Sequence, residues 1–233
     1  MRPLKASWNM AMLIESSSFA VLLRKRSDYP WMLHWAVLTP LLLTVFITGI
    51  LHGFWGEQPR VWYEYLRMTY PRITAAMRAI TNYSEFILHA VYCTILIHAV
   101  VVRDRDKIIF VLRFVIMALI YALVMTQFLK AGLGMPRPGH PLPPHPFNFS
   151  YNYSSFPSGH TVSIITAALP LALWGGRKKV CILLAITIAA VGMSRLWLGT
   201  HHPVDVLGSI VVSSMAVRSI LPPHCPGNPP KKE

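Results

Sequence analysis

Long runs of apolar residues recur along the chain and are separated by short polar segments. Six of these runs are candidate membrane-spanning helices, at 35–54, 83–102, 108–129, 161–174, 180–198 and 204–221. A helix needs roughly 20 apolar residues to cross the hydrocarbon core of a bilayer. The fourth run is shorter and contains Pro170. The pattern predicts an all-α integral membrane protein with about six transmembrane helices over residues 35–221.

The segments outside these runs have patterns of their own. Residues 1–34 do not resemble a signal peptide, because their basic cluster follows the apolar part, and we expect a helix at the cytoplasmic interface. Residues 55–82 repeat apolar positions at helical spacing between arginines, and Pro71 should bend or split that interfacial helix. Such a helix either packs on the bundle or forms a cationic shelf for anionic headgroups. The proline-rich segments 132–156 and 222–233 predict an irregular loop and a disordered tail.

The composition agrees with a membrane location and restricts the partners. Of the 233 residues, 54% are hydrophobic and 13% are charged, as in integral membrane proteins. The formal net charge is +13. The basic residues gather in short segments between apolar runs, which favours membrane lipids over nucleic acid as partners. Along the chain, every second polar segment between the apolar runs is richer in Lys and Arg, and this set of segments includes both ends of the chain. The positive-inside rule then predicts cytoplasmic termini.

Three short segments at the ends of apolar runs carry the candidate chemistry, and the first contains Lys130 and Arg137. Arg137 lies between two prolines, which stiffen the backbone around it. A guanidinium held in this way can bind two phosphate oxygens at once. Lys130 ends the third run, where a lysine can also simply extend to the membrane interface.

The second segment, Ser158-Gly159-His160, begins the fourth apolar run. Ser158 is a natural N-cap, and Gly159 lets a ligand approach the backbone closely. The free N–H groups of a first helical turn bind anions, and His160 could donate a proton to a leaving group. A capped helix start explains Ser158 and Gly159 equally well, but it does not explain the imidazole.

The third segment contains Arg195, His201 and Asp205. An ionisable residue such as Arg195 near the membrane interface is a functional candidate, with extension to the interface as the alternative. Asp205 could hold one ring nitrogen of His201 so that the other attacks phosphorus. It could equally satisfy the dipole at a helix start. The spacing favours His201 as the nucleophile, and a role for the adjacent His202 stays open.

The three segments read Lys130-x6-Arg137-Pro138, Pro157-Ser158-Gly159-His160 and Ser194-Arg195-x5-His201-x3-Asp205. In this order they resemble the tripartite signature of the type 2 phosphatidic acid phosphatase superfamily. The resemblance implies that His201 forms a phosphohistidine, Asp205 orients it and His160 protonates the leaving group. It implies that phosphate is held by Lys130, Arg137, Ser158, Gly159 and Arg195. It implies no metal and no cofactor.

The resulting expectation is a membrane lipid phosphatase with its site at the outer membrane interface. Candidate substrates are undecaprenyl diphosphate, phosphatidylglycerophosphate, phosphatidate and a lipid A phosphate, with selectivity from residues 55–82 and 147–156. The compact chain fits the bacterial inner membrane, with the site facing the periplasm. One alternative is a phosphotransferase that passes the phosphoryl group to another lipid. The other is a non-enzymatic transporter, which leaves the two histidines and the aspartate unexplained.

Overall fold

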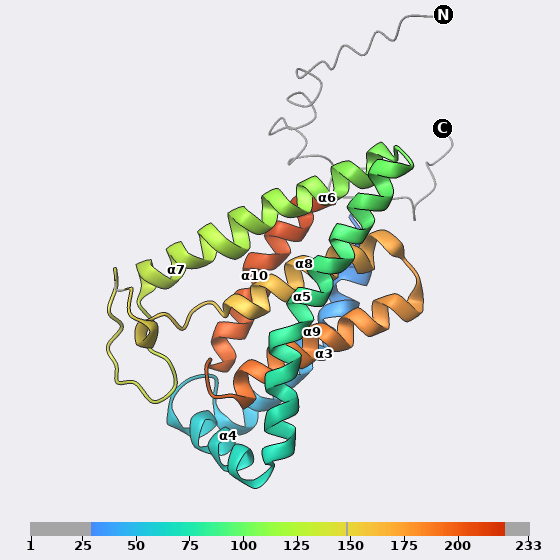
Figure 1. Ribbon diagram of the computed structural model, residues 1–233. Coiled ribbons are helices and arrows are strands. Elements are labelled where there is room, and N and C mark those ends of the chain that lie inside the picture. Colours follow the sequence, from blue (N-terminus) through green and yellow to red (C-terminus); the bar gives the residue numbers. More distant parts are fainter. Residues whose placement is uncertain (1–28, 148, 222–233) are drawn as a thin grey trace, which may run out of the picture.

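The computed structural model describes residues 29–147 and 149–221 (Figure 1). In these residues every regular element is a helix, and no β-strand is present. The all-α prediction is therefore confirmed. In chain order the elements are α3 (Trp31–His52), α4 (Glu57–Thr69), α5 (Pro71–Val101), α6 (Arg105–Met117), the π-helix η1 (Ala118–Met125), α7 (Thr126–Leu133), the 3-10 turn η2 (Tyr151–Tyr153), α8 (Gly159–Gly175), α9 (Lys178–Trp197) and α10 (Pro203–Ile220).

The protein is a multi-pass membrane protein. Within the described residues, five helical stretches are long and apolar enough to cross a membrane: Trp31–His52, Pro71–Val101, Arg105–Leu133, Lys178–Trp197 and Pro203–Ile220. The helix α8 is also apolar but has only 17 residues, so a sixth crossing stays a prediction. The predicted tail at 222–233, and nearly all of the predicted interfacial segment at 1–34, lie outside the described residues.

Several predicted boundaries need correction around the first two membrane helices. The helix α3 begins at Trp31, four residues before the expected start. The expected split at Pro71 is confirmed, since Tyr70 separates α4 from α5 and Pro71 occupies the first turn of α5. Proline is favoured there because its missing N–H would have no helical partner. The predicted second crossing at 83–102 starts too late, because α5 is continuous from Pro71 over 31 residues.

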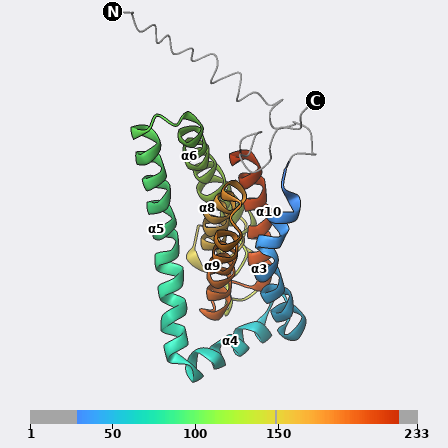
Figure 2. The ribbon, with the colours of Figure 1, turned by 90° about the vertical axis from the view of Figure 1, so that its right-hand side faces the viewer.

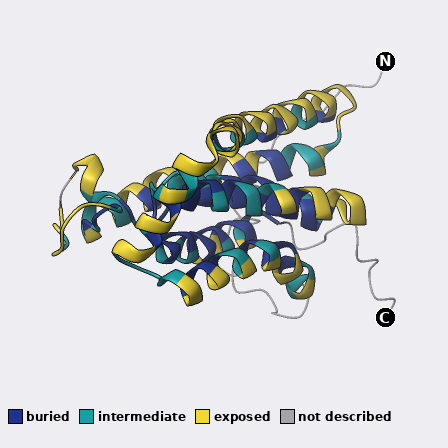
Figure 3. Ribbon diagram, turned by 90° about the horizontal axis from the view of Figure 1, so that it is seen from below, coloured by how far each residue is buried: buried dark blue, intermediate teal, exposed yellow. Residues whose placement is uncertain are grey.

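The buried centre of the molecule consists of α8, α9 and α10, with α3 against α9 (Figure 2). Glycine permits the contact between α3 and α9, because a Cβ added at Gly192 would lie 2.3 Å from Cδ1 of Leu41. Buried residues line the inner faces of the helices, and exposed residues gather on the outer faces (Figure 3). On α6 and η1 the exposed residues include Leu112, Val115, Leu119 and Leu123, as a lipid-facing surface requires.

All three sequence segments come together at one end of the bundle. Lys130 lies near the end of α7, Ser158 precedes α8, and His201 lies in the connection between α9 and α10. The short helix α4 lies at the same end, whereas α3 begins and α10 ends at the opposite end (Figure 2). The alternating direction of the helices therefore brings residues from distant parts of the chain to one site.

Candidate active site

A cavity of about 460 Å³ opens at this end of the bundle. Six of the eight predicted site residues line it, namely Lys130, Arg137, Gly159, His160, Arg195 and His201. The remaining lining residues are Gln127, Ala131, Phe149, Tyr151 and Ser154. The other two predicted residues, Ser158 and Asp205, are fully buried and are not among the lining residues.

His201 faces the cavity and is 4% exposed. Its Nδ1 lies 3.4 Å from Oδ2 of Asp205, within reach of an ion pair. Among the described residues Nδ1 has no aligned hydrogen-bond partner, so the contact with Asp205 is an electrostatic one. Burial lowers the pKa of His201 to about 4, although Asp205 opposes the shift. The imidazole is therefore neutral at pH 7, and the nearby carboxylate favours a proton on Nδ1 and a free lone pair on Nε2.

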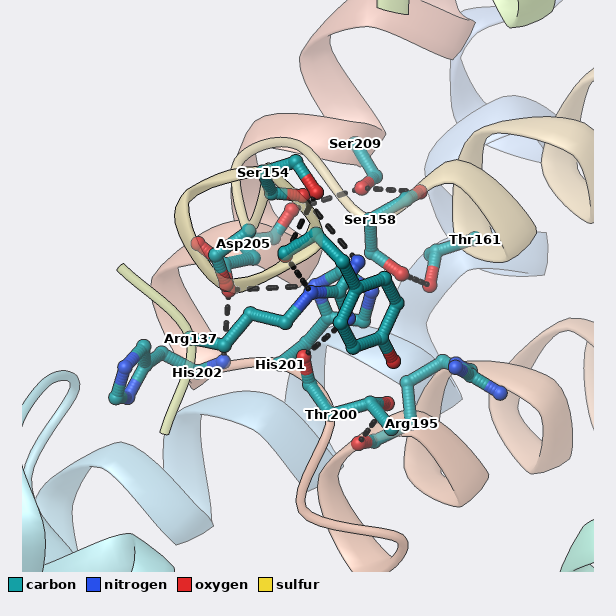
Figure 4. A network of polar contacts seen from close by, with 12 residues as sticks. Arg137, Ser154, Ser158, Thr161, Arg195, Thr200, His201, His202, Asp205 and Ser209 are labelled. Carbon is teal, nitrogen blue, oxygen red and sulfur yellow. Dashed lines mark hydrogen bonds and ion pairs between the residues drawn. The ribbon is translucent and has the colours of Figure 1, made fainter. Parts of the chain in front are cut away.

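Asp205 is held from two directions (Figure 4). Its Oδ2 accepts hydrogen bonds from Oγ of Ser155 at 2.5 Å and from the backbone N–H of His202 at 2.8 Å. Its Oδ1 has no partner within the part of the chain that the structure describes. Ser155 was not predicted as a site residue. It lies 50 residues before Asp205 and carries no motif of its own, so only the fold reveals the contact.

His202 has a different environment from its neighbour. Its ring stacks on Trp55, with the centroids 4.1 Å apart and the planes inclined by 25°. In Figure 4 the His202 ring points away from the cluster around His201. Burial lowers the pKa of His202 as well. Of these two adjacent histidines, His201 lines the cavity and His202 does not. His202 contacts Asp205 through its backbone N–H.

Arg137 is fixed by backbone carbonyl groups from two loops. Its Nε donates to Tyr151 at 2.8 Å, Nη1 to Thr200 at 2.9 Å and Nη2 to Ser154 at 3.3 Å. The ring of Tyr151 covers the guanidinium, with its centroid 3.9 Å from Cζ. Burial lowers the pKa of Arg137, and Tyr151 and Asp205 act in the opposite direction. An arginine remains charged in this situation, so the guanidinium is a preorganised cation that joins the first and third segments.

Arg195 and Lys130 supply the other two cations of the cavity. Arg195 is 8% exposed and donates from Nη1 to Oγ1 of Thr81 on α5 at 3.1 Å. Its Nε is buried with no partner in the described residues, which leaves a donor available for a ligand. A Cβ added at Gly159 would lie 3.7 Å from Nζ of Lys130. The absence of a side chain at Gly159 therefore keeps space open between this lysine and the first turn of α8.

Ser158 occupies the N-cap position of α8, as expected, but its side chain does not cap the helix. Its hydroxyl instead accepts a hydrogen bond from Oγ1 of Thr161 at 3.0 Å. The backbone of Ser158 contacts α10, since its N–H donates to the carbonyl of Asp205 and its carbonyl accepts from Ser209. Ser158 thus joins the starts of α8 and α10, and a direct contact of its hydroxyl with phosphate stays a prediction.

The arrangement suits a phosphoryl group, because three cations and one carboxylate surround a neutral imidazole. Comparison with known sequences agrees with this geometry. Residues 110–222 match the profile of the PAP2 superfamily, a stretch that contains all three segments. This part of the chain belongs to the PAP2 superfamily. We refer to residues 110–222 as the PAP2 segment.

Two relatives overlap parts of the chain. Undecaprenyl-diphosphatase BcrC of Bacillus subtilis (strain 168) is 40% identical over 74 residues, which are 32% of this chain and 35% of that protein. The putative undecaprenyl-diphosphatase YbjG of Escherichia coli (strain K12) is 34% identical over 91 residues, 35% of this chain and 45% of that protein. The chain thus spans less than half the length of each relative. No solved structure matches the chain.

Proposed function

We propose that the protein is a membrane phosphatase that removes the terminal phosphoryl group of a lipid diphosphate. The observation that carries the proposal is the neutral, nearly buried imidazole of His201, which lies beside Asp205 in a cavity lined by three cations. Membership of the PAP2 superfamily supports a phosphatase. We rank undecaprenyl diphosphate first among the candidate substrates, and the names of the two relatives, an undecaprenyl-diphosphatase and a putative one, support this order.

In the proposed reaction, Nε2 of His201 attacks the terminal phosphorus. A P–N bond forms while the bond from phosphorus to the bridging oxygen breaks, and His160 gives its proton to that leaving oxygen. Asp205 stabilises the positive charge that develops on the imidazole ring. Water then attacks phosphorus, returns a proton to His160 and breaks the P–N bond. The products are a lipid monophosphate and inorganic phosphate, and His201 is regenerated.

The cations would stabilise the charge on the transferred group. Lys130, Arg137 and Arg195 face the cavity, and the backbone at Gly159 opens a helix whose N–H groups favour anions. Such preorganised stabilisation is commonly a large part of catalysis. The scheme uses no metal, so chelation is part of the test.

The proposed location is the bacterial inner membrane, with the site at the periplasmic interface and cytoplasmic termini. The distribution of Lys and Arg along the chain supports this orientation. At the end of the bundle opposite the cavity, α3 begins and α10 ends (Figure 2). This placement is compatible with cytoplasmic termini and a periplasmic site.

The test measures inorganic phosphate released by purified wild type, His201→Ala and His98→Ala, with EDTA present. His98 is a matched control because it is exposed on α5, outside the cavity. The panel contains undecaprenyl diphosphate, phosphatidylglycerophosphate, phosphatidate and lipid A. We expect release by wild type and His98→Ala, and a loss of at least about 10⁴-fold in His201→Ala.

Wild-type activity in His201→Ala would overturn the assignment of the nucleophile, and loss of wild-type activity in EDTA would overturn metal independence. Phosphoryl transfer that occurs only after a second lipid is added would identify a phosphotransferase instead. No phosphoryl chemistry with any lipid would favour a transporter.

A further inference from the structure

The connection between α9 and α10, which carries His201, is contacted by residues that precede the PAP2 segment. These contacts come from the segment between α3 and α4, from α4 itself and from the start of α5. None of the residues involved belongs to the three sequence segments, and none lines the cavity. Together these residues contact both ends of the connection between α9 and α10.

Arg67 of α4 holds the first end. Its Nη1 donates a hydrogen bond of 2.7 Å to the carbonyl of Trp197, the last residue of α9. An arginine bound to a terminal helix carbonyl satisfies an acceptor that has no partner within the helix. The chain then turns at Gly199, which has φ of +67°, and a Cβ there would lie 2.6 Å from Nη1 of Arg67. The guanidinium therefore packs directly against the turn that leads to His201.

The same end is anchored a second time. Nε1 of Trp197 donates to Oγ1 of Thr74 at 3.0 Å, so the first turns of α5 contact the end of α9. The far end is held by the segment between α3 and α4. There the N–H of Val204 donates to the carbonyl of Phe54 at 3.3 Å, and Trp55 stacks on His202. His201 thus lies between two fixed points.

These contacts bear on the two alternatives expected for residues 55–82, a helix that packs on the bundle and a cationic shelf for headgroups. A cationic shelf requires free charges, but Arg60 pairs with Glu57 at 2.5 Å and with Glu64 at 2.9 Å. Arg67 is bound to the backbone of Trp197. Within 55–82 the arginines that remain exposed are Arg72 and Arg78, both on α5. The helix α4 is therefore better suited to hold the connection than to recruit headgroups.

We infer that Arg67 is a positioning residue, which fixes the α9–α10 connection so that His201 faces the cavity. The inference rests on the proposed function in one respect, the role of His201 as nucleophile. A displacement of about 1 Å in a reacting group can reduce a rate by about 100-fold. Loss of Arg67 should therefore lower the rate of attack by His201 and leave the binding of phosphate largely unchanged.

The experiment compares wild type, Arg67→Ala, Arg67→Lys and Arg72→Ala in two assays. The first measures kcat and KM with undecaprenyl diphosphate. The second measures phosphorylation of His201 by phosphoramidate, which transfers its phosphoryl group to imidazole and releases ammonia without any lipid. His201→Ala gives the background. Arg72→Ala is the control, because it removes the same charge from an exposed position at the start of α5.

We expect Arg67→Ala to lower kcat and the phosphoramidate rate at least 10-fold, with KM changed less than 2-fold. Arg67→Lys keeps a cationic hydrogen-bond donor, so its kcat and phosphoramidate rate should lie between those of Arg67→Ala and wild type. The rates of Arg72→Ala should match those of wild type. Wild-type rates in Arg67→Ala would overturn the inference, as would a rise in KM shared by Arg67→Ala and Arg72→Ala. If thermal unfolding shows that Arg67→Ala is not folded, Arg67→Lys decides by the same criteria.

The two proposals can fail separately. A wild type that accepts phosphate from phosphoramidate at His201 but hydrolyses no lipid would contradict the proposed function, and the inference would still be decided by the second assay. Labelling of wild type no greater than that of His201→Ala would overturn the inference together with its premise.

Discussion

His201 and His202 are adjacent in the chain, yet their rings have different surroundings. His201 faces the cavity beside Asp205, and His202 stacks on Trp55. The sequence pattern could favour His201 by its spacing to Arg195 and Asp205. It could not show where the second ring points, because that direction depends on an aromatic residue almost 150 positions earlier.

Ser155 is the clearest residue that sequence reasoning missed. We expect Ser155→Ala to reduce kcat by about 10-fold, which corresponds to about 1.4 kcal/mol, since Asp205 loses the hydroxyl that fixes its Oδ2. Hydrogen bonds to charged groups have contributions of this order. The measurement is phosphate release under saturating substrate. Ser219→Ala is the control, because Ser219 is a partly exposed serine near the end of α10, outside the cavity. An unchanged kcat in Ser155→Ala would remove Ser155 from the site.

The burial of His201 determines the pH dependence of kcat/KM that we expect. A neutral imidazole is the nucleophile, and it is lost as the pH falls through the pKa of about 4. The acidic limb of kcat/KM should therefore lie near pH 4 and not near 6.5, the ordinary pKa of histidine. Asp205 raises this pKa, so Asp205→Asn should move the limb to lower pH while it reduces kcat.

The measurement is the initial rate from about pH 3.5 to about pH 8. The ionisation of the substrate is determined separately by a phosphorus NMR titration, so that it can be subtracted. A limb near pH 6.5 that does not follow the substrate would show that His201 is more accessible to water than its 4% exposure indicates.

At the scale of helices, the apolar runs predicted the membrane elements because their length reflects the thickness of the bilayer. The ends were predicted less well. An apolar run reflects the part of a helix that lies in the bilayer, but α5 extends past the start of its apolar run, back to Pro71. The π-helix η1 was also invisible, because its residues continue the apolar pattern without a break. Just after η1, Oγ1 of Thr126 donates a hydrogen bond to the carbonyl of Tyr121, five residues earlier.

The loop that precedes α8 packs closely on α10 at Gly208. A Cβ at this position would lie 2.2 Å from two atoms of the Phe156 ring. Gly208→Ala should push Phe156 away, separate Ser155 from Asp205 and lower stability by about 1–3 kcal/mol. Thermal unfolding and phosphate release measure the two effects. Gly175→Ala is the control, because its added Cβ would meet no other part of the described chain within 4 Å, apart from its own helix backbone and its chain neighbours. Equal behaviour of the two variants would contradict this account of the packing.

At the scale of the whole molecule, the end of the bundle that carries the cavity should face outward. We expect a membrane-impermeant maleimide to label Arg72→Cys in intact cells and to label Arg177→Cys only after permeabilisation. Both positions are exposed, and they lie in segments on opposite sides of the predicted topology. The background is a variant without Cys93, Cys181 and Cys225. Equal labelling of the two positions in intact cells would contradict a crossing by α8.

The PAP2 segment depends on helices that come before it. Gly192 of α9 packs on Leu41 of α3, and Arg195 is held by Thr81 of α5. A fragment that starts at residue 105 would contain every catalytic motif, but it would expose the α3-facing side of α9 and leave Arg195 without this partner. We expect such a fragment to be unstable alone and to regain activity when residues 1–104 are co-expressed as a second chain. The unit that folds is larger than the unit that sequence comparison recognises.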